Sequence, residues 1–240
     1  MLGSATAILS AAEAEFVVEP SARGRGEGTA MLEALIARSP GGVLLWAHGD
    51  HPAARALAAR HGLVATRELL RLRAAVAPGE AEQFDHFVPG RDESEWVQVN
   101  SRAFAAHPEQ GSITVAGLER LEREPWFEAE EFLVARDGAG MVGYCWLKVD
   151  ESGTSGEIYA LGVDPDRRGE RLGSRLLEAG LARLGSRGIH NALLYVESGN
   201  SAALALYRSL GFAADAVDVQ YRLSSPSGHP ARVSIGGAVG

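Results

Sequence analysis

Two glycine-rich loops in this chain have the residue types that bind phosphate groups. The first is Arg23-Gly24-Arg25-Gly26-Glu27-Gly28, and the second is Arg168-Gly169-Glu170-Arg171-Leu172-Gly173. Each loop follows a short apolar segment and opens an amphipathic one, so several backbone N–H groups would point to one place where the helix dipole adds positive potential. Such a loop suits a pyrophosphate, although an ordinary strand-to-helix turn can have the same composition.

The loops belong to a unit that occurs twice. Residues 16–38 align with residues 161–183, and residues 44–63 align with residues 193–212. Each copy is typical of a strand, a proline-marked turn, the glycine loop and a helix, followed by a strand, a polar turn and a helix that ends near a glycine. The pattern predicts a tandem duplication in the α/β class, with mixed sheets flanked by helices.

The second copy is more complete than the first. Before its glycine loop the sequence predicts helices at 93–104 and 115–124 and strands at 131–136 and 141–149. We therefore expect a partial N-terminal domain at residues 1–75 that lacks its first elements, a linker that begins near Arg73, a complete C-terminal domain at 76–223, and a disordered tail at 224–240.

Composition narrows the possible partners and the compartment. The 31 acidic and 23 basic side chains give a net charge of -8, which argues against nucleic acid and suits a small amine. Cys145 is the single cysteine, and no apolar run is long enough to span a membrane. The histidines show no spacing typical of a metal site. We expect a cytoplasmic monomer without a metal and without a membrane contact.

Three segments resemble the core motifs of the GNAT superfamily of acetyl-CoA-dependent N-acetyltransferases. They are EIYALGVDP at 157–165, the second glycine loop, and ESGNSAALALYRSLGF at 197–212. The first glycine loop also matches the R/Q-x-x-G-x-G/A signature of acyl-CoA binding, whereas Arg171 replaces the inner glycine of the second.

Flanking segments make the resemblance more specific. They are NSRAF at 100–104, HPEQG at 107–111, EPWF at 124–127, LYVES at 194–198 and VDVQY at 217–221. Together these resemble the mycothiol synthases, tandem GNAT proteins that acetylate the cysteinyl amine of desacetylmycothiol. The resemblance covers about residues 16–223.

The resemblance implies which residues bind acetyl-CoA. In the second copy they are Leu161, Gly162, Val163, Arg168, Gly169, Glu170, Arg171, Leu172, Gly173, Ser174, Asn200, Ser201, Ala202, Ala203, Leu204 and Ala205. In the first copy they are Phe16, Val17, Val18, Arg23, Gly24, Arg25, Gly26, Glu27, Gly28 and Thr29. In GNAT domains the strand that contains Leu161 to Val163 diverges from its neighbour at a bulge, and Asn200 would also cap the following helix.

The resemblance also implies a catalytic pair. Glu157 is the candidate general base, directly or through a water, and its alternative is a solvated carboxylate at a strand start. Tyr207 is the candidate acid or hydrogen-bond donor to the leaving thiolate, and its alternative is a core aromatic. A tyrosine of pKa ~10 donates a hydrogen bond to a thiolate more easily than a full proton. The repeat aligns Tyr207 with Ala58, so we expect the N-terminal copy to be non-catalytic.

For substrate contacts the resemblance implies Glu109, Lys148, Glu157 and Tyr195. Trp126 and Phe127 are expected to pack in the core, and Cys145 to be a buried hydrophobe. Two alternative functions stay open from the residues alone. One is a GNAT enzyme for another small amine or a protein N-terminus, and the other is a catalytically inactive CoA-binding protein.

Overall fold

The computed structural model describes residues 5–9, 13–39, 42–105, 107, 110–150 and 153–223. The proposed substrate contact Glu109 and the predicted tail at 224–240 lie outside the described residues. By contacts the chain forms two compact units. The N-terminal unit comprises the residues up to Leu69 together with those from Val217 onward, and the C-terminal unit comprises Leu70–Ala216.

The N-terminal unit contains two helices and parts of two long strands. Its elements are β1 (Ala5–Leu9), β2 (Glu13–Val18), η1 (Pro20–Ala22), α1 (Glu27–Arg38), β3 (Leu44–Ala47), η2 (His48–Asp50), α2 (Pro52–Arg60), the first part of β4 (Leu63–Ala75) and the last part of β10 (Ala213–Leu223). β1 is antiparallel to β2, β2 is parallel to β3, and β3 is antiparallel to β10. Leu32, Leu35 and Leu45 are buried in its core.

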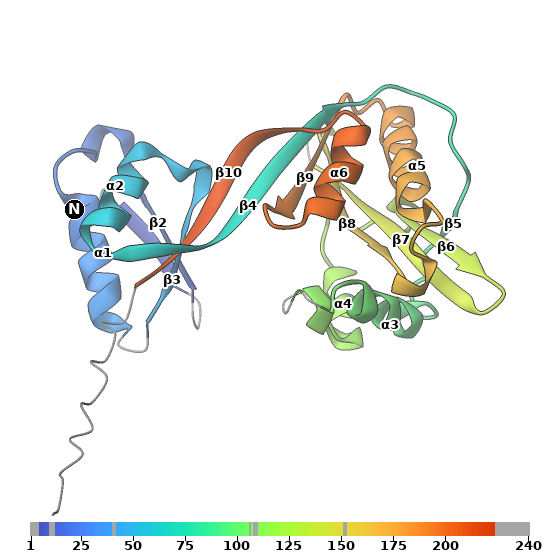
Figure 1. The fold of residues 1–240 in the computed structure, drawn as a ribbon, viewed down its shortest axis with the longest axis horizontal. Coiled ribbons are helices and arrows are strands. Elements are labelled where there is room, and N and C mark those ends of the chain that lie inside the picture. Colours follow the sequence, from blue (N-terminus) through green and yellow to red (C-terminus); the bar gives the residue numbers. More distant parts are fainter. Residues whose placement is uncertain are drawn as a thin grey trace, which may run out of the picture. The chain divides into compact units, whose positions relative to one another are not determined.

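The C-terminal unit has the larger part of the fold (Figure 1). Its elements are β5 (Asp85–His86), α3 (Glu93–Ala103), η3 (Gln110–Ser112), α4 (Val115–Leu121), η4 (Ala129–Glu131), β6 (Phe132–Asp137), β7 (Gly140–Val149), β8 (Gly156–Val163), η5 (Pro165–Arg167), α5 (Leu172–Ser186), β9 (Asn191–Glu197) and α6 (Ser201–Ser209). The strand order is β4-β9-β8-β7-β6-β5. The pairs from β5 to β8 are antiparallel, and β8 is parallel to β9.

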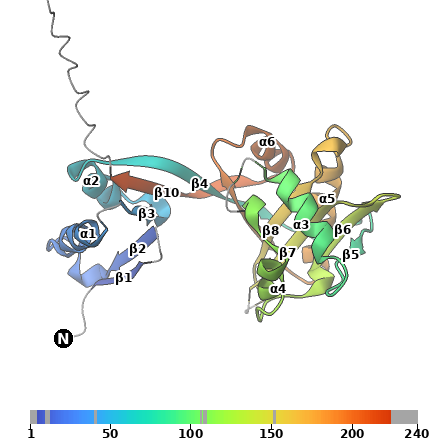
Figure 2. The same cartoon turned by 90° about the horizontal axis from the view of Figure 1, so that it is seen from below.

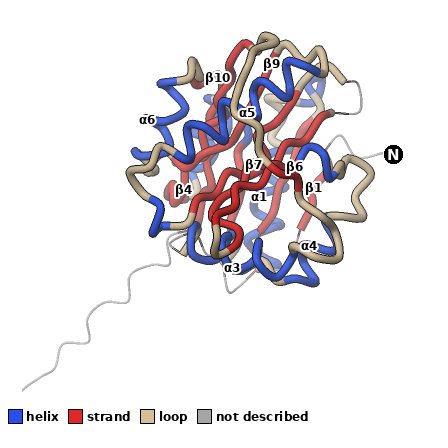
Figure 3. Tube along the Cα trace, turned by 90° about the vertical axis from the view of Figure 1, so that its right-hand side faces the viewer, coloured by secondary structure: helices blue, strands red, loops and turns tan. Residues whose placement is uncertain are grey.

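Helices cover both faces of this sheet. α5 lies on one side of β6 and β7, and α3 and α4 lie on the other (Figures 2 and 3). The core on the α5 face includes Leu176, Leu177 and Cys145. The core on the α3 face is aromatic, with Trp96 and Trp146 almost fully buried. The predicted mixed sheet flanked by helices is confirmed.

The last strand of each repeat pairs in the sheet of the other repeat. β10 comes from the second copy, yet Val219 of β10 faces Ala47 of β3 in the N-terminal unit. β4 comes from the first copy, yet it is the neighbour of β9 in the C-terminal unit, where the Val76 N–H donates to the His190 carbonyl at 2.9 Å. The linker expected from Arg73 is therefore wrong at its start, because β4 continues to Ala75.

Candidate active site

β8 and β9 part just beyond Glu157. The described ladder between them consists of two pairs, Gly156 with Ala192 and Glu157 with Leu193. On its other side, β8 has one extra residue, Tyr159, because Trp146 of β7 faces Ala160 and Leu147 faces Ile158. This bulge bends β8 away from β9. Residues 161–163 pair with β7 alone in the described ladders, which is the divergence that the GNAT resemblance implies.

The second glycine loop has a tight backbone turn at the start of α5. Gly169 has φ of 87°, and Arg171, the residue before the helix, has φ of 58° in the left-handed region. No side chain caps α5, so the N–H groups of its first turn are available to an anion. Ser174 lies in that turn, and a Cβ added at Gly173 would lie 3.6 Å from Leu206 and 3.7 Å from Val163. The helix therefore starts close against α6 and β8.

The first glycine loop has the same backbone conformation. Gly24 and Gly26 have φ of 75° and 89°, and Gly26 precedes α1, which also lacks a side-chain cap. A Cβ added at Gly28 would lie 3.7 Å from Val18 at the end of β2. Gly26 takes this left-handed conformation without strain. Arg171 takes the same conformation, which costs a residue with a Cβ about 1 kcal/mol in backbone strain.

α6 and its N-terminal cap contain two proposed parts of the site, the coenzyme-binding residues from Asn200 to Ala205 and the catalytic residue Tyr207. Asn200 caps the helix, because its side chain accepts a hydrogen bond from the Ala203 N–H at 3.1 Å, and the predicted cap is confirmed. Ser201, Ala202 and Ala205 are exposed, whereas Leu204 is buried. The segment therefore offers one exposed side and one side that packs against the core.

Tyr207 is mostly buried on the inner side of α6. Its ring packs against Phe212, with ring centroids 5.9 Å apart, in the core on the α5 face. Burial raises the pKa of the Tyr207 hydroxyl well above its usual value. A weaker acid gives up its proton less readily, so this environment favours a hydrogen-bond donor over a full proton donor.

Glu157 and Lys148 lie opposite each other on β8 and β7. Lys148 is two residues beyond Trp146, so it shares the strand face that packs on α3 and α4. Burial raises the pKa of the Glu157 carboxyl, and the nearby Lys148 ammonium acts in the opposite direction. Among the described residues, none donates a hydrogen bond to this carboxylate, which leaves it available as a proton acceptor.

Gln110 of the HPEQG segment is attached to the same side of the unit through Asn100. Asn100 Nδ2 donates to the Gln110 carbonyl at 2.6 Å, and the Gln110 amide donates back to Asn100 Oδ1 at 3.1 Å. The Tyr144 hydroxyl donates to the same oxygen at 2.7 Å. His107 Nε2 lies 3.9 Å from a carboxylate oxygen of Glu197, at the end of β9. Gln110 is therefore held against α3, and His107 lies beside the end of β9.

Sequence reasoning missed Asn100 and Tyr144. The available signal was an asparagine on the apolar face of a predicted helix, which needs a buried partner. Tyr144 also explains Gly162, because a Cβ added there would lie 2.6 Å from the tyrosine ring. The glycine is thus required by close packing on β7.

Tyr195 lies on β9, where 44% of its surface is exposed. Beside it, Arg71 of β4 donates through Nε to Asp215 at 2.8 Å, and Arg73 donates through Nε to the same carboxylate at 3.0 Å. Asp215, and to a smaller extent Tyr195, raise the pKa of Arg71. Sequence reasoning missed these arginines because they lie on a strand of the first repeat.

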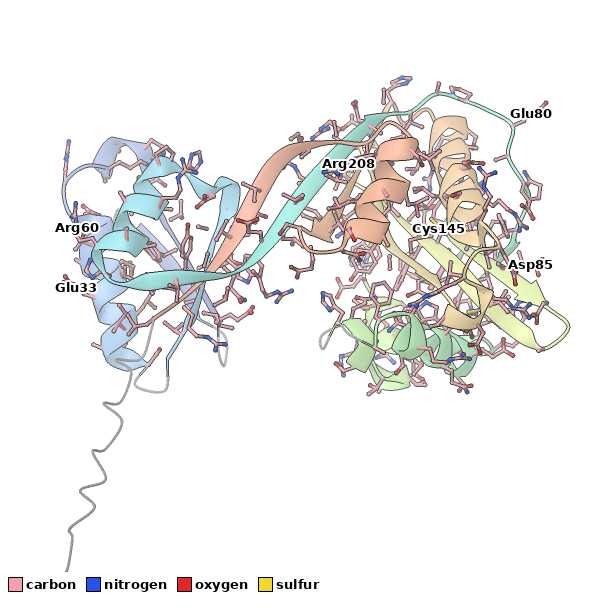
Figure 4. The ribbon with its side chains drawn as sticks, viewed as in Figure 1. Glu33, Arg60, Glu80, Asp85, Cys145 and Arg208 are labelled. Atoms are coloured by element: carbon pink, nitrogen blue, oxygen red, sulfur yellow. The ribbon has the colours of Figure 1, made fainter. Side chains whose placement is uncertain are left out.

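Three further features of the described residues concern membranes, metals and the cysteine. No helix there is long and apolar enough to cross a membrane, and no cluster of three His, Cys, Asp or Glu side chains in that part of the chain could hold a metal ion. Cys145, labelled in Figure 4, is fully buried, and burial raises the pKa of its thiol to about 12. It is the buried hydrophobe that the sequence predicted.

The fold is that of the GNAT acetyltransferases. The acetyltransferase (GNAT) family matches residues 96–212. A GCN5-related N-acetyltransferase from Sphaerobacter thermophilus superposes with a TM-score of 0.75 at 22% identity, covering 91% of this chain and 76% of that chain. A tandem GNAT protein from the clavulanic acid biosynthesis pathway superposes with a TM-score of 0.64 at 17% identity, covering 89% and 75%.

Curated relatives place the chain more narrowly. The mycothiol acetyltransferase of Clavibacter michiganensis subsp. michiganensis is 50% identical over 221 residues, which cover 88% of this chain and 72% of the relative. That of Thermobispora bispora is 47% identical over 220 residues, which cover 87% and 75%. The chain belongs to the mycothiol acetyltransferase family of acetyl-transferring enzymes.

Proposed function

We propose that this chain transfers the acetyl group of acetyl-CoA to the cysteinyl amine of desacetylmycothiol. The observation that carries the proposal is the position of Glu157. Its half-buried carboxylate lies at the point where β8 and β9 part, opposite Lys148, and no described residue donates a hydrogen bond to it. Membership of the mycothiol acetyltransferase family supports the choice of substrate.

The second glycine loop and the uncapped start of α5 form the proposed pyrophosphate site. The left-handed turn at Gly169 and Arg171 exposes backbone N–H groups, and the Arg171 guanidinium is exposed and adds positive charge. The unpaired edge of β8 at residues 161–163 and the exposed side of α6 from Asn200 to Ala205 would hold the pantetheine arm. The cosubstrate supplies the acetyl group as a thioester.

The first glycine loop is proposed as a second coenzyme site without catalysis. Its backbone has the same left-handed turns before an uncapped helix, and Phe16, Val17 and Val18 precede it at the end of β2. Ala58 is buried at the position that aligns with Tyr207, so this copy has no hydroxyl to donate to a thiolate.

In the proposed reaction Glu157 accepts a proton from the substrate ammonium and passes it to solvent. The neutral amine then forms the new C–N bond as the thioester C–S bond breaks, and Glu157 accepts the second proton that the nitrogen loses as it becomes an amide. A raised pKa brings a carboxylate closer to the working pH and makes it a stronger base. Tyr207 donates a hydrogen bond to the departing thiolate, which then takes its proton from solvent. The buried hydroxyl stays protonated because its pKa is raised.

Glu109, Lys148 and Tyr195 are the proposed contacts to the rest of the substrate, together with Glu157. Lys148, Glu157 and Tyr195 come from three neighbouring strands of the C-terminal unit. Hydrogen-bonding groups of this kind reject an amine that lacks the matching hydroxyls, because they would be left unpaired. A monomer in the cytoplasm remains part of the proposal and fits the unpaired, buried Cys145.

The test is thiol release from acetyl-CoA with desacetylmycothiol as acceptor, with mass spectrometry of the acetylated product. Parallel reactions use other amines, including an aminoglycoside and a peptide with a free N-terminus. Preferred turnover of desacetylmycothiol supports the proposal. Faster transfer to another amine would assign the chain to a different acceptor, and tight binding of acetyl-CoA without release of thiol would make it a binding protein.

A further inference from the structure

The Lys148 ammonium lies over two aromatic rings. Its Nζ is 4.6 Å from the centroid of Trp126 and 5.9 Å from that of Tyr159. The two rings are 4.9 Å apart, and both pack against the buried Trp146, at 5.6 and 5.0 Å. We call Trp126 and Tyr159 the aromatic cradle. Trp126, expected to act in packing alone, thus has a second contact.

The cradle is built by two unrelated parts of the chain. Trp126 lies in the segment between α4 and η4, whereas Tyr159 is the bulge residue of β8. The bulge lets Tyr159 and Ala160 both pack on the α3 face. Tyr159 is two residues from Glu157 and so shares its face, and the extra residue keeps Ala160 on that face as well. Strand alternation from Glu157 therefore places an aromatic ring beside Lys148, next to the bulge at which β8 and β9 part.

A lysine near the end of a strand samples many rotamers, so its charge has no defined position unless something holds it. A cation over aromatic faces gains about 0.5–2 kcal/mol, depending on its exposure. That gain is enough to favour the rotamers in which the ammonium stays on the cradle, and Lys148 is half-buried there. Its cross-strand neighbour is Glu157.

The charged and titratable groups around this lysine are few. Glu157 and Tyr159 face it from β8, and Glu124 lies close to Tyr159 from the segment that also contains Trp126. β9 places the apolar Leu193 beside Glu157. Lys148 is therefore the cation that acts on Glu157 among the described residues.

We propose that the aromatic cradle is a positioning element that holds the Lys148 ammonium beside Glu157 and so sets the proton affinity of the acid–base site. The proposal rests on the proposed function, in which Glu157 is the base. A fixed cation disfavours protonation of Glu157 and also disfavours a second cation, the substrate ammonium. It thereby favours the neutral, nucleophilic form of the amine.

The first test needs no substrate. Lys148 is the single lysine of the chain, so protein labelled with lysine carrying ¹³C at the ε carbon gives one ε-methylene signal in NMR. The ring currents of the cradle should displace this signal from the position of free lysine. Trp126→Leu should return it towards that position, and Trp126→Phe should restore part of the displacement.

Phe127→Leu is the matched control. Phe127 packs against the same Trp146, with centroids 5.8 Å apart, and no contact between it and Lys148 is seen. This variant loses a similar amount of aromatic packing and should leave the lysine signal displaced. An undisplaced signal in the parent protein, or equal changes in Trp126→Leu and Phe127→Leu, would overturn the proposed contact.

The second test is the pH profile of kcat/KM with desacetylmycothiol. Lys148→Met and Trp126→Leu should move the acid limb to higher pH, because loss of the nearby cation raises the pKa of the base. Since an opposite charge nearby lowers the pKa of a carboxyl by about one unit or more, the expected shift is about one pH unit for Lys148→Met and less for Trp126→Leu. Trp126→Phe and Phe127→Leu should show little shift.

The two tests separate the two proposals. An unmoved acid limb in Lys148→Met would overturn the positioning role, even if the NMR contact is present. Absence of turnover by the parent protein would instead contradict the proposed function, and the displaced lysine signal would still decide whether the cradle holds the ammonium.

Discussion

Replacement of Glu157 by glutamine removes the proposed base and leaves the size of the side chain almost unchanged. A general base contributes about 10²–10⁴-fold to a rate, so kcat at pH 7 should fall by a factor in that range. Acetyl-CoA should bind with unchanged affinity, because Glu157 lies before the part of β8 that is proposed to hold the coenzyme.

The loss of kcat in Glu157→Gln should depend on pH, because the amine of the substrate changes its protonation state between pH 7 and pH 9. An α-amino group of pKa ~8 is roughly one-tenth neutral at pH 7 and roughly nine-tenths neutral at pH 9. The parent enzyme removes the proton itself, so its kcat should be flat across this range. The variant depends on solvent to remove the proton, and its kcat should rise about tenfold.

Stability separates lost chemistry from lost folding. Burial raises the pKa of Glu157 in the folded protein. The stability linked to this group is therefore present below its unfolded pKa and is lost as pH rises through the folded pKa. Above that pKa the buried, ionised carboxylate destabilises the folded state, so Glu157→Gln should unfold at the same temperature as the parent protein or at a higher one.

Steady-state thiol release at pH 7 and pH 9 measures the fall in kcat and its dependence on pH. Thermal unfolding of the same samples measures the stability. Glu178→Gln on the exposed side of α5 is the control, since it changes the same charge away from the site. A kcat within about threefold of the parent at pH 7, far inside the range for a lost base, would refute the assignment of Glu157. So would an equal deficit at pH 9.

Three further predictions concern other residues. Tyr207→Phe should lower kcat by about 10-fold or more, as expected for a lost hydrogen bond to a thiolate. The melting temperature should not fall, because no described group accepts a hydrogen bond from this hydroxyl. Arg171→Gly should raise the melting temperature by about 2–4 °C, because glycine adopts the left-handed backbone without strain. Gly26→Ala should lower the melting temperature through backbone strain alone, since no atom lies within 4 Å of the added Cβ to clash with it. Asp92 is buried, which raises its pKa, but hydrogen bonds from Arg91, from the Val88 N–H and from Arg136 lower it overall. The stability that Asp92 contributes should be lost as pH falls through this lowered pKa, and urea unfolding of Asp92→Asn across acidic pH should show a smaller loss.

Local interactions explain which parts of the site could be predicted. The Asn200 cap needs the residues of one helical turn, and the glycine loop needs the backbone freedom of a few consecutive residues. The replacement of the inner glycine by Arg171 is also a local feature, and the backbone there takes the same left-handed turn as at Gly26. The helices and strands of the C-terminal unit begin and end within a few residues of their predicted limits.

Contacts between distant segments could not be predicted. The buried hydrogen bonds of Asn100 join α3 to β7 and to the HPEQG segment. The place of Arg71 beside Tyr195 depends on which strand is the neighbour of β9. No periodicity in the sequence encodes these partners, because Gln110 lies 10 residues and Tyr144 44 residues from Asn100, and Arg71 and Tyr195 are farther apart still.

The sequence by itself determined the duplication, the α/β class, the glycine turns and the alternation of buried and exposed residues along each strand. Alternation sets which face a side chain occupies but does not choose the partner strand, and the last strands of two homologous repeats suit either sheet. Only the tertiary structure decided that β4 and β10 each pair in the sheet of the other repeat. Only the tertiary structure, too, revealed the bulge at Tyr159, which turns two successive residues to one face, and the contact of Lys148 with the rings of Trp126 and Tyr159.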